Sequence, residues 1–117
     1  MLAGEAFVEA NDLADQAIEI VGQAIVTDLA STFTAGTAAA LVGYAMTEEA
    51  GRQVFDQAGL GIDDFQVIEL HDCFSANELL TYEALGLAAE GEGHKLIDND
   101  DTTYGGRWVV NPSGGLI

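Results

Sequence analysis

The chain has 117 residues, 49% of them hydrophobic, and 20 acidic against three basic residues give a formal net charge of −17 at pH 7. Such a charge repels phosphate backbones and anionic membrane surfaces, so nucleic acid is excluded as a partner. A single cysteine excludes an internal disulfide and a cysteine-cluster metal site, and no stretch approaches the ~18 apolar residues of a membrane span. We expect one domain over residues 1–117, without an internal boundary or a metal, in a reducing, cytoplasm-like compartment.

The N-terminal part predicts a short helix followed by a strand. Residues 1–15 are acidic and rich in alanine, which favours a helix that ends near Asn11. In residues 17–25, alternate positions share one face of an extended chain, namely Ile18, Ile20, Gly22 and Ala24. We therefore expect a strand there, and Gly22 inside it indicates a close approach by another backbone.

The next region predicts turns and then a longer helix. Residues 27–37 are rich in Thr, Ser, Gly and Ala and are expected to form a turn, whereas residues 38–42 suit one helical turn. Thr47 is typical of a helix N-cap. We predict a helix from Thr47 to Ala58, with Gly59 as its C-terminal stop.

The centre of the chain predicts a strand that leads into a helix. Residues 65–70 are apolar except for Gln66 and Glu69, with β-branched residues in the middle, and indicate a buried strand. Ser75 and Glu78 are spaced as a capping box, which predicts a helix from Ala76 that stops at Gly86. A helix on each side of a strand favours an α/β layer.

Four residues lie between this strand and this helix: His71, Asp72, Cys73 and Phe74. Open α/β sheets present their chemistry at such a place, at the carboxyl end of a strand beside a helix N-terminus. The candidate site therefore lies here.

The C-terminal region is mostly loop by pattern. Residues 88–106 are polar, and their aspartates lack the central glycine and distal glutamate of an EF-hand, so we expect a solvated loop. Residues 108–110 indicate a brief strand, followed by a turn over residues 111–115. The abrupt ending suggests a truncated chain.

Four segments resemble the thiolase superfamily, in particular the thiolase domain of sterol carrier protein X and bacterial lipid-transfer-protein-type thiolases. They are residues 24–29, 41–47, 71–87 and 103–117. The resemblance implies the thiolase fold, an α/β fold of two similar halves, each a mixed sheet with covering helices. This chain resembles the first part of the C-terminal half.

The resemblance also implies a reaction. Thiolases cleave 3-oxoacyl-CoA with CoA, or run the reverse Claisen condensation, through an acyl-cysteine intermediate, here in lipid or sterol side-chain metabolism. Acyl-CoA and CoA are then the substrates, no cofactor is implied, and a homodimer or an accessory-subunit complex is expected. The nucleophilic cysteine would precede Met1 and the Gly-His-Pro motif would follow Ile117, so the chain alone is expected to be inactive. The compartment would be the cytoplasm in a bacterium and the peroxisome in a eukaryote.

His71 stands at the matched catalytic position, where other thiolases carry the Asn of an Asn-Glu-Ala-Phe motif. An imidazole at a strand end can donate an N–H to a developing enolate or oxyanion, or exchange a proton near neutral pH. The structural alternative is a buried histidine that hydrogen-bonds within a loop. For Cys73 we expect a small buried hydrophobe, with a nucleophile activated by His71 as the alternative.

A second group of residues is expected to bind substrate: Tyr104, Asn111, Pro112, Ser113, Gly114 and Gly115. In the resembled family the Asn-Pro-Ser-Gly-Gly stretch lines the active site, and its glycines let backbone approach the thioester. Simple turn chemistry explains the same residues equally well.

Two rival functions remain. The first is a thiolase-fold retro-aldolase that cleaves steroid side chains with an accessory partner, although such enzymes tend to carry Tyr at the position of His71. The second is a non-catalytic thiolase-like scaffold subunit.

Overall fold

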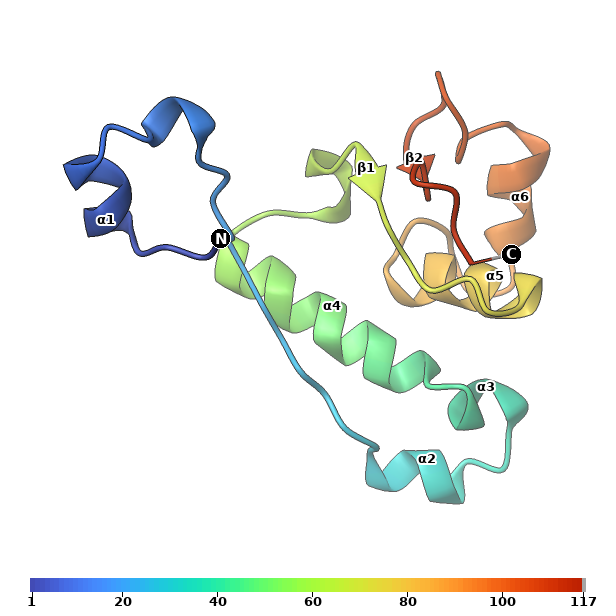
Figure 1. Ribbon diagram of the computed structural model, residues 1–117. Coiled ribbons are helices and arrows are strands. Elements are labelled where there is room, and N and C mark those ends of the chain that lie inside the picture. Colours follow the sequence, from blue (N-terminus) through green and yellow to red (C-terminus); the bar gives the residue numbers. More distant parts are fainter. Residues whose placement is uncertain (117) are drawn as a thin grey trace.

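A computed structural model describes residues 1–116 (Figure 1). Its sheet pairs β1 (Val67–Ile68) with β2 (Val109–Val110) in parallel, with Val67 opposite Val109 and Ile68 opposite Val110. Parallel strands need a crossover connection, and here it contains α5 (Ser75–Ala84) and α6 (Gly93–Asp98). This helix, strand, helix arrangement confirms the α/β class, although both strands are shorter than predicted and the sheet of the described residues is parallel rather than mixed.

The hydrophobic core lies between the strand pair and the crossover helices. Its buried members are Tyr82, Leu87, Leu96 and Trp108, and the half-buried side chains packed on them include Ile68 and Val110 from the strands. The Trp108 indole Nε1–H also donates to the carbonyl oxygen of Ile62, at 3.2 Å. That carbonyl belongs to a 3₁₀ turn, η2 (Ile62–Asp64), which is thereby held against the core.

The long helix α4 (Tyr44–Ala58) begins three residues earlier than predicted. Thr47 lies inside its first turn, and its hydroxyl donates to the carbonyl oxygen of Gly43 at 3.1 Å instead of capping the helix. The predicted C-terminal stop is confirmed, because Gly59 follows the last helical residue with a φ of 67°.

Helix α5 begins at Ser75, within one residue of the prediction, but the predicted capping box is absent. The N-cap position is Phe74, which makes no side-chain cap bond. Glu78 has another partner: its carboxylate accepts from the Tyr82 hydroxyl one turn later. The stop at Gly86 is confirmed, with a φ of 82°.

The first N-terminal helix, α1 (Glu5–Ala10), ends with Asn11 as its C-cap, as predicted, and a 3₁₀ turn, η1 (Ala14–Gln16), follows. The strand predicted for residues 17–25 is not formed. A strand requires a neighbour for its N–H and C=O groups, and no other strand of the described residues lies beside this segment.

The segment instead runs as a straight coil across α4 (Figure 1). Gly22, Ala24 and Val26 are half-buried while the residues between them are exposed, so the predicted alternation of faces is confirmed from Gly22 on. It is not found at Ile18 and Ile20, which are 93% and 66% exposed. The predicted close approach at Gly22 is confirmed, because a Cβ there would lie 3.0 Å from the carbonyl oxygen of Val54.

Two of the three short helices that flank α4 and follow α5 fall in regions predicted as turn or loop. Helix α3 (Ala38–Leu41) is the predicted helical turn, whereas α2 (Ala30–Thr34) occupies the predicted turn 27–37. Helix α6 occupies the predicted loop 88–106; its Leu96 is buried in the core, and its Gly93 N–H donates to the Glu83 carboxylate at 2.9 Å. Helix α6 is therefore held by tertiary contacts of single residues, and a polar sequence pattern does not reveal such contacts.

The chain exposes much of its apolar surface. Its accessible area is 8060 Å² and its radius of gyration is 16.6 Å, against about 6,100 Å² and about 13 Å expected for a compact monomer of this size. The exposed large side chains include Ile18, Ile20, Ile25, Phe33, Leu41 and Phe74. Within residues 1–116 no helix is both long and apolar enough to cross a membrane.

We expect salt to compact and stabilise the 117-residue chain. Its net charge of −17 opposes folding through self-repulsion, and raising sodium chloride to about 1 M shortens the screening length to about 3 Å. Melting curves by circular dichroism should shift upward with salt, and the hydrodynamic radius should fall. Sucrose at equal osmolality is the control. A sharp melt that does not move with salt would contradict this expectation.

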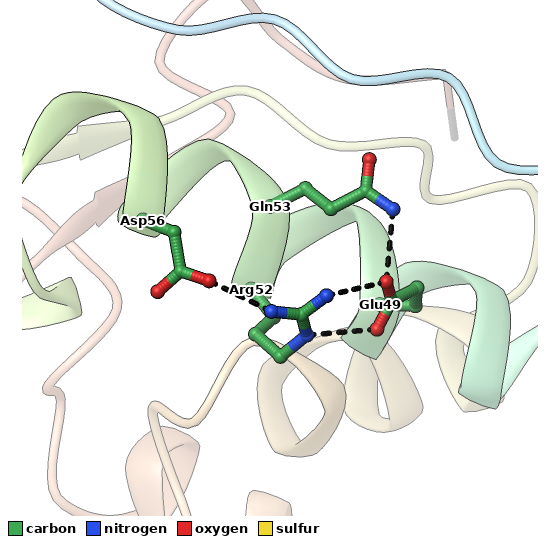
Figure 2. Close-up of polar contacts among 4 residues, drawn as sticks. All are labelled: Glu49, Arg52, Gln53 and Asp56. Atoms are coloured by element: carbon green, nitrogen blue, oxygen red, sulfur yellow. Dashed lines mark hydrogen bonds and ion pairs between the residues drawn. The ribbon is translucent and has the colours of Figure 1, made fainter.

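The exposed face of α4 carries a local ion network (Figure 2). The Arg52 guanidinium donates to both carboxylate oxygens of Glu49, at 2.8 and 2.7 Å, and to Asp56 at 2.7 Å. Gln53 donates to the same Glu49 carboxylate at 2.8 Å. The hydrogen bonds from Arg52 and Gln53 lower the pKa of Glu49 from 4.5 to about 2.

This network predicts a pH dependence of α4. Because the folded pKa of Glu49 is depressed, its stabilising contribution is complete above about pH 4.5 and is lost as the pH falls towards about 2. Glu49→Gln should remove that part of the acid dependence of the melting temperature, whereas Glu48→Gln, an exposed neighbour outside the network, should not. Equal acid profiles for the two variants would contradict the assignment.

Candidate functional site

The predicted site residue His71 lies in the coil between β1 and α5, at the carboxyl end of the strand. Its backbone carbonyl accepts from the Asn77 side-chain amide at 2.9 Å, so the first turn of α5 holds its main chain. The side chain is exposed, and its imidazole has no hydrogen-bond partner in residues 1–116. This placement differs from that of a buried histidine bonded within a loop, and it leaves the imidazole available to a ligand.

His71 lines a pocket of about 620 Å³ between the start of α4 and the first turns of α5, which is a volume typical of small-molecule sites. Apolar side chains form much of its wall, and polar groups are contributed by His71, Thr47 and Asn77 among others. The complete lining is Val42, Thr47, His71, Cys73, Phe74, Ala76, Asn77, Leu80 and Thr81. A smaller pocket of about 380 Å³ between α4 and β1 is lined mainly by apolar side chains.

Cys73 is half-buried and carries a free thiol that faces the same pocket. None of the pocket residues is Lys or Arg, the cations that commonly activate a thiolate. Among the residues that line the pocket, His71 is the one that could act as a base toward the Cys73 thiol. A structural role for Cys73 remains our prediction.

The predicted turn over residues 111–115 is docked on the end of β1. Asn111 donates its backbone N–H to Ile68 O, and its side-chain oxygen accepts from the Leu70 N–H, both at 2.8 Å. Ser113 donates its N–H and its hydroxyl to the Glu69 carboxylate, at 3.0 and 2.7 Å. The turn therefore lies beside the strand end that carries His71, although none of its residues lines the pocket.

Asp72 completes this attachment. Its carboxylate is buried, 6% exposed, and accepts from the Leu116 N–H at 2.7 Å. Gly115 lies so close that a Cβ on it would overlap the Asp72 carboxylate, and its φ of 68° disfavours other residues as well. Packing within the fold is thus a sufficient reason for a glycine at this position.

The other predicted binding residues are placed differently. Gly114, with a φ of 116°, donates its N–H to Asn111 O at 2.9 Å, and Pro112 is half-buried within the turn. Tyr104 is 76% exposed and lies in neither the turn nor the pocket. Substrate binding by these residues remains a prediction.

The pocket is lined by no Asp, Glu, Lys or Arg side chain, although the chain as a whole carries a formal net charge of −17. The three basic residues of the chain, Arg52, Lys95 and Arg107, are each paired with a carboxylate, and none lines the pocket. Within α5, burial and the hydrogen bond to Glu78 raise the pKa of Tyr82, so its hydroxyl stays a donor at neutral pH. In residues 1–116 no three His, Cys, Asp or Glu side chains gather as metal ligands.

Sequence reasoning did not identify the partners of Glu69 and Asp72 in the turn. One signal was present, because Glu69 is the single charged residue in an otherwise largely apolar strand. A charge at such a position indicates a specific partner, but Ser113 lies 44 residues away and is not identified by the pattern.

Comparisons with known proteins agree with one another. A model of the family described as thiolase C-terminal domain-like matches residues 27–117. Sterol carrier protein 2 of Rattus norvegicus is 56% identical over 117 residues, which are 100% of this chain and 21% of that protein. The benzoylsuccinyl-CoA thiolase subunit BbsB of Thauera aromatica is 43% identical over 77 residues, which are 66% of this chain and 20% of that protein.

A solved structure, the Ltp2-ChsH2(DUF35) aldolase, is similar with a TM-score of 0.57 and 33% identity, over 59% of this chain and 18% of that one. The chain thus spans about a fifth of the length of these curated relatives.

Proposed function

This chain belongs to the thiolase C-terminal domain-like family, and from that membership we propose that the whole protein is a thiolase-type acyltransferase. By the whole protein we mean the complete gene product that contains these residues. It cleaves a 3-oxoacyl-CoA with CoA, or runs the reverse condensation, in lipid or sterol side-chain metabolism. The naming of relatives as a CoA-thiolase subunit and as sterol carrier proteins supports this assignment.

The observation that carries the proposal is the position of His71. Its imidazole is exposed, unpaired within the described residues and directed by a strand end into a pocket of about 620 Å³. Cleavage at a thioester passes through a tetrahedral oxyanion and an enolate, and a preorganised N–H donor stabilises that negative charge more than it stabilises the substrate. His71 supplies this donor, directly or through a water molecule.

The remaining roles follow from the same proposal. The acyl-accepting cysteine is supplied by another part of the whole protein, and Cys73 is structural. The turn of Asn111, Pro112, Ser113, Gly114 and Gly115, together with Tyr104, contacts the substrate. A homodimer or an accessory-subunit complex covers the exposed apolar surface. Two names support such a complex, because one relative is named as a thiolase subunit and the similar aldolase structure is named for two components. The protein acts in the cytoplasm of a bacterium, or in the peroxisome if it is eukaryotic.

A retro-aldolase is the second candidate, and the similarity to the Ltp2-ChsH2(DUF35) aldolase favours it. Such an enzyme splits a 3-hydroxyacyl-CoA into a carbonyl compound and a shorter acyl-CoA, and it consumes no free CoA. The histidine at position 71 favours the thiolase, because tyrosine is expected there in the aldolases.

Product analysis separates the two. The whole protein is incubated with a 3-oxoacyl-CoA and CoA, and in parallel with the matching 3-hydroxyacyl-CoA alone, and the products are resolved by chromatography. Thiolysis consumes one CoA and yields two acyl-CoA thioesters. Release of an aldehyde or ketone from the 3-hydroxy substrate, with no cleavage of the 3-oxo substrate, would overturn the proposal in favour of the aldolase.

A further inference from the structure

Residues 68–72 at the end of β1 are attached to the 111–116 turn at almost every position. Ile68 and Leu70 bond to Asn111, and Glu69 binds Ser113. Asp72 binds Leu116. Only His71 is omitted from this series, and it is the residue with its imidazole in the pocket.

The bond made by Asp72 differs from the others in its surroundings. The Glu69–Ser113 pair is exposed to solvent, whereas the Asp72 carboxylate is 6% exposed. A buried carboxylate that accepts a backbone N–H is worth more than a surface pair, and it is costly to disrupt. Gly115 packs so closely on the same carboxylate that a Cβ on it would overlap with the Asp72 oxygen.

On the basis of the proposed function, we infer that Asp72 is a positioning residue for His71. Asp72 accepts from Leu116 N–H and packs on Gly115, and it thereby fixes the 111–116 turn against the end of β1. The main chain of residue 71 is then held from both sides. The other side is held by the Asn77 amide, which donates to His71 O at 2.9 Å. The direction in which the Cα–Cβ bond of His71 leaves the main chain is therefore set before substrate arrives.

Three variants of the whole protein test this inference. Asp72→Ala removes the carboxylate, Asp72→Asn keeps an oxygen that can accept from Leu116 N–H, and Asp63→Asn is a control at an exposed carboxylate. Hydrogen exchange of the peptide that covers residues 112–117 reports the attachment itself. Steady-state thiolysis reports its consequence for the reaction.

We expect Asp72→Ala to speed exchange in that peptide and to lower kcat by about 10- to 100-fold with little change in KM, since small misplacements of a reacting group cost up to about 100-fold. Asp72→Asn should exchange more slowly in that peptide and keep a higher kcat than Asp72→Ala. Asp63→Asn should match the wild type in both measurements. Unchanged exchange in Asp72→Ala, or faster exchange with an unchanged kcat per folded molecule, would overturn the inference. An Asp72→Asn variant as impaired as Asp72→Ala would overturn it too, because the charge and not the attachment would then matter.

A double-mutant cycle with Gly115→Ala provides a second arm. The added methyl group collides with the Asp72 carboxylate, so Gly115→Ala should lower kcat in the wild type and should cost less in an Asp72→Ala background. Additive effects would count against a shared attachment. If the wild-type protein shows no thiolysis, the proposed function fails, and the exchange data alone then decide whether Asp72 holds the turn.

Discussion

His71→Ala in the whole protein is expected to lower kcat for thiolysis by about 100- to 1,000-fold, the loss found when a single oxyanion donor is removed. The reason is that the imidazole N–H is aimed at charge that develops only in the transition state, so KM should change little. The measurement is steady-state cleavage of a 3-oxoacyl-CoA, with melting temperature recorded in parallel. His94→Ala, the other histidine of the chain, is the control: it is exposed and lies outside the pocket.

His71→Asn distinguishes the possible roles of the imidazole. An amide N–H can occupy similar space, and asparagine is the residue at this position in other thiolases, so a donor role predicts more activity for His71→Asn than for His71→Ala. A general-base role predicts that both variants are equally impaired and that the pH–rate profile loses its limb near neutral pH. Wild-type turnover in a well-folded His71→Ala protein would contradict any chemical role.

Trp108→Ala is expected to destabilise the fold by about 3–5 kcal/mol, the usual cost of truncating a buried aromatic residue. Trp108 is 1% exposed, packs in the core beside β2, and donates to Ile62 O, so its loss leaves a cavity and removes one of the two hydrogen bonds that this carbonyl accepts. Tyr104→Ala, at a 76% exposed position, should change stability by less than about 0.5 kcal/mol. Urea denaturation of the whole protein, followed by circular dichroism, measures both.

The stability of the Trp108 variants is relevant to the candidate site, because the core that contains Trp108 supports the elements on either side of His71. Trp108 and Tyr82 lie between the strand pair and α5, and these elements hold the two ends of the segment that carries His71. Trp108→Phe should fall between the wild type and Trp108→Ala. A loss below about 1 kcal/mol for Trp108→Ala, well under the usual cost, would show that the core is not organised around this residue.

The features that the sequence predicts well are those with local causes. Gly59 and Gly86 end their helices because a glycine accepts the left-handed conformation, and this is visible in the sequence itself. The strand at residues 67–68 and the following helix likewise arise from short runs of residue type. His71 was therefore placed correctly, at a strand end and before a helix.

The features that sequence reasoning missed depend on which partner each group meets, and residue type and spacing alone do not specify that partner. Residues 17–25 have the alternation of a strand, but a strand also needs a neighbour, and alternation does not supply one. Glu78 has the spacing of a capping box, yet Tyr82 competes for its carboxylate. The bond from Leu116 to Asp72 joins residues 44 positions apart, so nothing near Asp72 in the sequence indicates it.

The central claim is that His71 supplies a donor to the thioester oxygen, and a structure of the whole protein with a bound acyl-CoA tests it most directly. The account predicts that an imidazole nitrogen of His71 lies about 2.7–3.1 Å from the thioester carbonyl oxygen, or reaches it through one ordered water. A well-ordered thioester whose carbonyl oxygen is bound by other groups, with the His71 imidazole turned away from it, would contradict the account.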